Sequence, residues 1–462
     1  MQTYFSNWIS NPSGYMDNKI IIVVALVAIV AIGGAAAYML MDDDEEKYSD
    51  FVYDDVRLTV FGNANGDDVI DGNDRYVLEQ IIAGEKDMKD CPFADANGDG
   101  KITQADIDIV EKLMAGKETD VRFNDHAGTT HTIKYPLNNT VAVNEDMTTW
   151  HTTFGANGAL AGTTSNAKNY PNSIKMLSEN TKILPSGMRG FSAQTWQSFI
   201  ELNKSLIDKG ESIEAVVSDR MAGVGDYADD LENLNIPVII IRCTDPVLTI
   251  DGTVLMGFLY GPEICEKSLK FVDRCDKEMA YLNKQLEKVP EDEKVPFLAF
   301  CMTNALAQTE SQYTLMGIAA GGKAVVRDEG ASSPHIKDPE LITTYNGIAK
   351  QYIENKTMDI TVKKPSQLFS GNINMLEKGD AFNTTAFINL SMPGVCKVLY
   401  IASVLYPDLI EESYVDGVLQ DLFDEFMPQV NTLVEDGDFD VREDMSTVVT
   451  WQDWQDELKG TA

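Results

Sequence analysis

The sequence predicts an α/β protein whose main part has two lobes joined by one long helix, preceded by a small all-α module and a transmembrane helix. Three observations lead to this prediction. An uncharged run near the N-terminus is followed by two acidic loops in tandem. From residue 121, short apolar runs alternate with longer helical patterns, which is typical of an α/β fold. A single amphipathic stretch, 262–289, separates the third apolar run from the fourth.

Composition limits the classes of function. The chain has 462 residues, of which 44% are hydrophobic, so it is long enough for several domains with buried cores. Its formal net charge is −36, from 73 acidic and 37 basic residues. Such a surface repels phosphate backbones, so we expect no nucleic-acid partner. The same charge keeps a protein soluble and also favours the binding of cations.

The uncharged run covers residues 20–41. At about 1.5 Å per residue, a helix of this length matches a bilayer core of about 30 Å. Lys19 precedes the run and an acidic cluster, 42–46, follows it, so the charge bias places residues 1–18 in the cytoplasm and the bulk of the chain outside. A cleaved signal peptide is the alternative, because the run ends in small residues. Both interpretations make the protein extracytoplasmic, at the cell surface.

The two acidic loops read NANGDDVIDGND at 63–74 and DANGDGKITQAD at 95–106. Calcium binds six to eight oxygen atoms, and a twelve-residue loop supplies them from alternate positions, with glycine at the bend and a carboxylate at the end. The second loop offers these ligands throughout: Asp95, Asn97, Asp99, Lys101 (through its carbonyl), Thr103 and Asp106. The first loop offers the corresponding set: Asn63, Asn65, Asp67, Val69 (through its carbonyl), Asp71 and Asp74.

The first loop departs from the pattern at two positions. Asn63 removes one negative charge, and Asp68 stands where the second loop has Gly100. We therefore expect calcium in both loops, bound more weakly in the first; a polar turn that binds no metal is the alternative. Each loop is followed by an amphipathic pattern that ends at a glycine, Gly84 or Gly116, and the whole unit repeats after 32 residues. Neither helix can bury its apolar face alone, so the two should pack against each other.

This arrangement, with one helix per loop and aspartate as the closing ligand, resembles the type I dockerin module. The resemblance covers about residues 55–118. It implies a cohesin on another protein as a possible partner, or a role as a rigid calcium-dependent spacer.

Four apolar runs in the larger part predict strands, and polar loops follow them, as expected for ligand sites at the carboxyl ends of parallel strands. The runs are 140–143, 213–217, 237–241 and 296–300. The helix predicted at 262–289 carries apolar residues at spacings of three and four, including Val272, Cys275, Met279 and Leu282. At about 1.5 Å per residue it would extend about 42 Å, which suits a rod between two lobes. An ordinary crossover helix is the alternative.

Several segments in order resemble the helical-backbone (class III) substrate-binding proteins of ABC importers, a family that carries ferric siderophores, cobalamin, haem and some metals. The segments are 123–128 (FNDHAG), 133–136 (IKYP), 139–143 (NTVAV), 235–239 (NIPVI), 318–322 (IAAGG) and 394–426. The resemblance implies a class III periplasmic-binding-protein fold with an N-lobe, a backbone helix and a C-lobe. The expected organisation is a cytoplasmic N-terminus (1–18), an anchor or signal peptide (19–41), an acidic linker (42–54), the dockerin-like module (55–118), the N-lobe (119–261), the linking helix (262–289), the C-lobe (290–440) and an acidic tail (441–462).

The family's function implies a ferric siderophore, related metal chelate or corrinoid as ligand and an ABC permease in the membrane as partner. Arginines and aromatic side chains suit an anionic chelate or a large planar corrinoid. The candidate ligand contacts are Trp150, His151, Arg189, Arg220, Asn304, Arg327, Phe369 and Asn372. We do not expect an enzyme, although two alternatives stay open: a surface adhesion protein that acts through dockerin and cohesin, and a dockerin-bearing polysaccharide-degrading enzyme.

Overall fold

The computed structural model divides the chain into residues 1–55 and a second compact unit, Val56–Ala462. It describes only part of the second unit. The expected membrane segment at 20–41 and the acidic linker lie outside the described residues, and no described helix is long and apolar enough to cross a bilayer. The described ranges are 56–143, 145–164, 177–185, 191–219, 223–241, 248–299, 312–324, 341–344, 347–350, 381–383, 394–426 and 447–449.

The small module consists of helices α3 (Gly72–Ala83) and α4 (Gln104–Met114), each preceded by one acidic loop, with a short 3-10 helix η2 (Met88–Asp90) between them. The two helices pack against each other, as predicted, because their apolar faces share one buried cluster. Gly84 ends α3 in a left-handed conformation, and Gly116, the residue after the C-cap of α4, also has a positive φ of 61°. The cluster contains Ala64, Val77, Leu78, Cys91, Ala94, Ile107 and Val110.

An antiparallel hairpin follows the module: β1 (Thr119–Asn124) pairs with β2 (Thr130–Tyr135). The backbone just before the first loop lies along β1. Val60 forms a β-bridge with Phe123, and the amide of Phe61 donates to the carbonyl of Arg122 at 2.9 Å. The module is thus joined to the larger part by backbone pairing as well as by chain connectivity.

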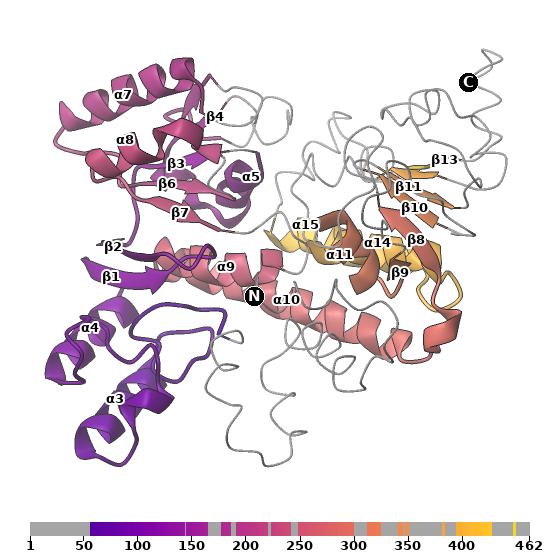
Figure 1. Cartoon of the computed structure of the whole chain (residues 1–462), viewed down its shortest axis with the longest axis horizontal. Helices are drawn as coiled ribbons and strands as arrows, with labels where there is room; N and C mark the ends of the chain where they lie inside the picture. The colour runs from indigo at the N-terminus through magenta and orange to yellow at the C-terminus, as the bar shows by residue number, and fades with distance from the viewer. Residues whose placement is uncertain are drawn as a thin grey trace, which may run out of the picture. The chain divides into compact units, whose positions relative to one another are not determined.

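The N-lobe contains a five-stranded parallel sheet in the order β5-β4-β3-β6-β7. Figure 1 shows helices α5 (Glu145–Phe154), α7 (Ala193–Ile207) and α8 (Ala228–Asn233) beside this sheet. Three of its strands confirm the predicted apolar runs at 140–143, 213–217 and 237–241. The strands are β3 (Thr140–Val143), β4 (Leu160–Thr164), β5 (Lys182–Leu184), β6 (Ala215–Ser218) and β7 (Val238–Ile240).

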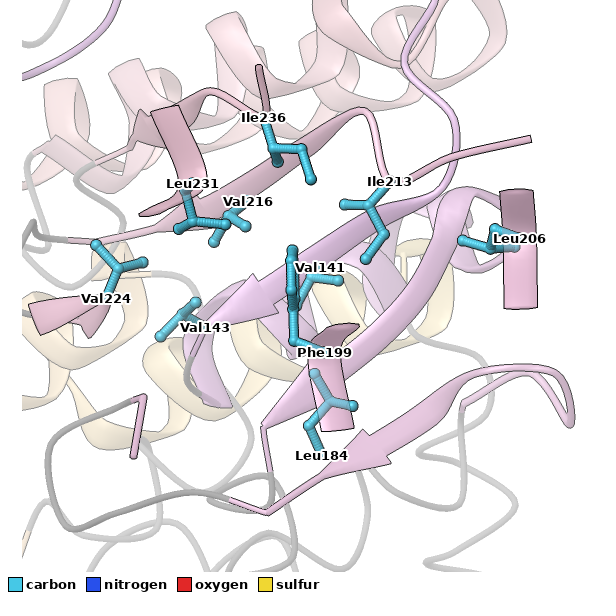
Figure 2. Packing of buried hydrophobic residues seen from close by; sticks show 10 residues of the cluster. All are labelled: Val141, Val143, Leu184, Phe199, Leu206, Ile213, Val216, Val224, Leu231 and Ile236. Carbon is cyan, nitrogen blue, oxygen red and sulfur yellow. The ribbon is translucent and has the colours of Figure 1, made fainter. Parts of the chain in front are cut away.

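The N-lobe core lies between this sheet and its helices. Figure 2 shows Val141 and Val143 of β3 and Val216 of β6 with Phe199 of α7 and Leu231 of α8. Strands buried on both faces read as continuous apolar runs, which explains why β3 and β6 were visible in the sequence. The core therefore fixes the strand ends, where a ligand site of this fold class would lie.

Helix α10 (Pro262–Leu286) confirms the predicted long helix and ends three residues earlier than 289. It begins at a proline and buries the residues expected from the spacing pattern, among them Val272, Cys275 and Leu282. Helix α9 (Leu248–Leu259) precedes it and packs closely on it: a Cβ atom at Gly257 would lie 2.5 Å from Ser268.

The C-lobe contains a six-stranded mixed sheet in the order β13-β12-β11-β10-β8-β9. β8, β9 and β10 are parallel, and the strands from β10 to β13 are antiparallel. β13 comes from the segment expected to be an acidic tail. Helices α11 (Gln312–Ala319), α14 (Gly394–Leu405) and α15 (Glu412–Phe426) belong to this lobe (Figure 1). The strands are β8 (Pro296–Ala299), β9 (Lys323–Ala324), β10 (Leu341–Thr344), β11 (Gly347–Lys350), β12 (Ala381–Asn383) and β13 (Thr447–Val449).

Candidate functional site

The second acidic loop is curled by hydrogen bonds from its own amides to its side chains. The carboxylate of Asp95 accepts from the amides of Gly98 at 2.8 Å and Gly100 at 2.9 Å. The side-chain oxygen of Asn97 accepts from the amide of Asp99 at 2.8 Å. Bonds of this kind are the usual means by which Asp and Asn form turns. They hold the side-chain oxygens of Asp95 and Asn97, two of the predicted ligands, against the backbone of the loop.

The closing carboxylate of this loop also caps the helix that follows. Asp106 is the third residue of α4 and forms a capping box with Thr103, whose amide donates to Asp106 at 2.8 Å. Its other oxygen accepts from the amide of Asn97 at 3.2 Å, and the side chain is fully buried. A negative charge is favourable at a helix N-terminus, so the first turn of α4 holds this ligand in place.

The first loop repeats these bonds at the 32-residue offset. The side-chain oxygen of Asn63 accepts from the amide of Gly66, as Asp95 does from Gly98. The carboxylate of Asp74 accepts from the amides of Asn65 at 3.1 Å and Asp71 at 2.8 Å, and it caps α3. The sequence repeat is therefore a repeat of the hydrogen-bond pattern.

The environment of Asp74 tests whether the first loop suits a cation. The side chain is fully buried, and its bonds are to backbone amides. The pKa of Asp74 is raised to about 6: burial is the largest cause, the amides of Asp71 and Asn65 lower the pKa, and the carboxylates of Asp67 and Asp71 raise it. A buried carboxylate among other carboxylates fits a bound cation, which would favour its charged form.

The chemistry of the donors indicates calcium. Within the described ranges, no three side chains of His, Cys, Asp or Glu converge as a metal site. The amide oxygens of asparagine and the main-chain carbonyls would therefore supply part of each coordination sphere, and hard cations such as calcium accept such oxygens. Asp95, Asn97, Asp99 and Asp106 would hold calcium in the second loop, with Asn63, Asn65, Asp67, Asp71 and Asp74 in the first.

The sixth position of the loops shows a clear difference. Gly100 has φ 81°, a left-handed conformation that glycine adopts without strain. Asp68 is not among the described residues with positive φ, so the first loop takes another path at this position. Its side chain instead pairs with Arg57. The sequence difference at Asp68 therefore changes the backbone conformation at the sixth position. It also provides a carboxylate that pairs with Arg57.

In the N-lobe, two candidate ligand contacts lie in the interior. His151 of α5 is fully buried: Nδ1 lies 2.6 Å from the carbonyl oxygen of Met147, and Nε2 lies 2.7 Å from the hydroxyl of Tyr260. Trp150 is 5% exposed, and its indole N–H donates to Thr253 at 3.3 Å. Burial lowers the pKa of His151 to about 4, so the ring is neutral at pH 7. In this arrangement both residues stabilise the N-lobe core.

The carboxyl ends of the parallel strands carry hydroxyl groups. Thr164 ends β4 and Ser218 ends β6, and both are buried. The opening segment of the N-lobe is fastened to the same edge, because the carboxylate of Asp125 accepts from the amide of Ile240 at the end of β7. The other candidate contacts lie outside the described residues and stay predictions: Arg189, Arg220, Asn304, Arg327, Phe369 and Asn372.

Residues 62–115 match the family model described as the dockerin type I domain. This segment is a type I dockerin domain. The match agrees with the repeated loops, the capping aspartates and the packed helix pair described above. No curated protein matches the chain.

Several solved structures are similar to part of the chain. One is an ABC transporter solute-binding protein from Sulfurospirillum deleyianum, with 14% identity, 66% of this chain and 94% of that chain covered, and a TM-score of 0.44. A periplasmic solute-binding protein from Veillonella parvula has 15% identity, coverage of 67% and 93%, and a TM-score of 0.44. A periplasmic molybdate-binding protein from Haemophilus influenzae has 12% identity, coverage of 66% and 98%, and a TM-score of 0.45.

Two arginines that the sequence interpretation did not single out join the dockerin to the larger part. Arg122 of β1 donates to the carbonyl of Asp95 at 3.2 Å, and its guanidinium lies over the ring of Phe61. Arg57 pairs with both Asp68 of the first loop and Asp276 of α10. The sequence signal for Arg57 was its position, since only Lys47 and Arg57 are basic between the acidic run at 42–46 and the acidic loop at 63–74.

Proposed function

We propose that the protein is the extracytoplasmic substrate-binding component of an ABC importer, held at the membrane through residues 20–41. It captures a ferric siderophore, a related metal chelate or a corrinoid and delivers it to a permease. The observation that carries this proposal is the pair of separate sheets, one parallel and one mixed, connected along the chain by the 25-residue helix α10. The segments that resemble the class III family stand in the same order along this framework.

The geometry of the N-lobe supports ligand capture at its strand ends. Open α/β sheets bind ligands outside the carboxyl ends of parallel strands. Arg220 lies two residues after the end of β6, and Arg189 comes a few residues after β5. We propose that these two arginines, with Arg327 and Asn304 from the C-lobe, contact the anionic groups of a chelate, because guanidinium groups bind carboxylates and similar oxyanions in bidentate fashion.

Tryptophan fluorescence provides the test. A purified ferric hydroxamate siderophore, cyanocobalamin and haem would each be titrated into the intact chain, and one of them should quench the emission at submicromolar concentration. The double variant Arg189→Ala/Arg220→Ala should weaken that ligand by about tenfold or more, since each lost charge-assisted bond contributes more than 1 kcal/mol.

The control is Arg75→Ala, which removes an exposed arginine of α3 that pairs with Glu79 and Glu111. This variant should bind as the wild type does. If none of the three ligand classes quenches the fluorescence, the proposal fails for these classes. If the double variant binds with unchanged affinity, the two arginines are not ligand contacts.

The dockerin favours a second function, attachment to a cohesin-bearing protein. The observation that favours it is the match over residues 62–115 together with both acidic loops. In this case the dockerin would tether the binding domain to another surface protein. A purified type I cohesin should bind the chain with calcium and be released by a chelator; equal binding under both conditions would contradict a dockerin-mediated contact.

A further inference from the structure

We propose that Arg57 couples the dockerin to helix α10, so that calcium binding in the first loop stabilises the turn of α10 that also holds C-lobe helix α15. This inference goes beyond ligand capture and does not depend on it. It gives the dockerin a direct ion-pair contact with α10, the long helix of its own chain.

Arg57 lies between two carboxylates that are far apart in sequence. Its Nη1 donates to both oxygens of Asp276, at 3.1 and 2.9 Å, and its Nε donates to Asp68 at 3.0 Å. The three side chains are only 15%, 18% and 28% exposed for Arg57, Asp276 and Asp68. Solvent therefore screens these contacts less than it screens an ordinary surface ion pair.

The same turn of α10 is bonded to the C-lobe. Arg274 pairs with Asp421 of α15 at 3.1 Å. The hydroxyl of Tyr414, also on α15, donates to the buried carboxylate of Glu278 at 2.5 Å. Asp276 lies between these two residues in sequence. Within five residues, α10 thus contacts both the dockerin and α15. A restraint at Asp276 therefore acts on the same turn of α10 that is bonded to α15.

The first loop supplies the connection to calcium. Asp68 stands between Asp67 and Val69, two predicted calcium ligands. A bound ion would hold the backbone on both sides of Asp68, and this would fix the position of the carboxylate that Arg57 contacts. Calcium and the Arg57 contacts then favour the same loop conformation. By linkage, each stabilises the other.

The second loop cannot act in this way. Its residue at the sixth position is Gly100, which has no side chain to form such a contact. Arg122 reaches this loop only through the main-chain carbonyl of Asp95 among the bonds described. The coupling is therefore expected to depend on Asp68 and Arg57 and not on calcium binding in general.

Hydrogen exchange of the peptide covering residues 270–282 tests the coupling. The intact chain, in a mild detergent, would be compared with saturating calcium and with a chelator, without any transported ligand. Calcium should slow exchange in this peptide by about tenfold, which corresponds to a change of about 1.4 kcal/mol in local opening. Asp68→Gly should abolish the slowing while leaving calcium binding intact, because glycine suits the sixth position of such a loop.

Arg57→Met should also abolish the slowing, and Arg75→Met, at another arginine of the dockerin, should retain it. Calcium occupancy of both loops would be checked by calorimetry in every variant. Slowing that persists in Asp68→Gly, or no slowing in the wild type with both loops occupied, would overturn the proposal. If Arg57→Met does not fold, Asp68→Gly decides the question. Failure of this experiment leaves ligand capture untouched, since no ligand is present.

Discussion

The imidazole of His151 is fully buried beside Met147, Tyr260 and Thr140. Sequence position alone made it a candidate ligand contact, because it follows the first strand of the parallel sheet. The side chain points into the core instead, since α5 begins immediately after β3 and presents this face to the sheet. A residue's place along the chain did not determine which side of the helix it occupies.

The buried state of His151 predicts a loss of stability in acid. Its folded pKa of about 4 lies below the model-peptide value of 6.5, so the unfolded chain binds the proton more readily. The contribution of His151 to the free energy of unfolding is fully present above pH 6.5 and is lost as the pH falls from 6.5 towards 4. The loss should approach about 3 kcal/mol, which urea unfolding at several pH values would measure.

The variant His151→Gln isolates this effect. It should be less stable than the wild type at pH 7 but should lose less stability between pH 6.5 and 4. Gln194→Ala, at an exposed residue of α7 that does not titrate, provides the comparison and should retain the wild-type slope. An unchanged slope in His151→Gln would show that other groups cause the acid sensitivity.

At the scale of the element, the two predicted calcium loops share one hydrogen-bond pattern and differ at two positions. In both, the aspartate predicted as the closing ligand also forms the capping box of the following helix, so the start of α3 or α4 and the predicted cation site depend on one side chain. The loops differ at the first and sixth positions, where Asn63 and Asp68 replace Asp95 and Gly100. Asn63 removes one negative charge from the first position, and Asp68 adds a side chain and a different backbone path at the sixth.

Calorimetry should therefore find two calcium-binding events of unequal strength in the intact chain. Asp106→Ala should remove the stronger event and Asp74→Ala the weaker one, and each should also destabilise its helix by about 1 kcal/mol through loss of the cap. Asp108→Ala, on the exposed face of α4, is the matched control and should keep both events. A single event in the wild type would mean that the first loop does not bind calcium.

The elements with strong sequence signals were the predictable ones. β3, β6, β7 and β8 are apolar runs in the sequence, and α10 has a proline at its start and a regular apolar spacing. The hairpin β1–β2 and helix α9 were not predicted. β1 and β2 alternate polar and apolar residues over only six positions, and α9 is apolar almost throughout, so neither has a clear period that separates helix from strand.

At the scale of the whole molecule, the net charge of −36 opposes compaction by self-repulsion. Raising NaCl from about 0.01 M to about 1 M shortens the screening length from about 30 Å to about 3 Å. In calcium-free buffer, the thermal unfolding midpoint should therefore rise by a few degrees. KCl should act equally, since screening does not depend on the identity of the cation. A midpoint that falls with salt would contradict this prediction.

The sequence by itself determined the features that depend on local chemistry. The two loops and their ligands are short patterns in which every oxygen donor is a neighbour in sequence, and the long helix has its own period and its own start signal. The proposed ligand, permease and membrane segment also come from sequence and stay proposals.

Only the tertiary structure decided how these parts meet. It placed His151 and Trp150 in a core, brought Arg57 between Asp68 and Asp276, and paired the segment before the first loop with β1. These contacts join residues separated by as many as 219 positions. Local patterns carry no information on such pairings, because they arise when elements with complementary charge and shape pack together.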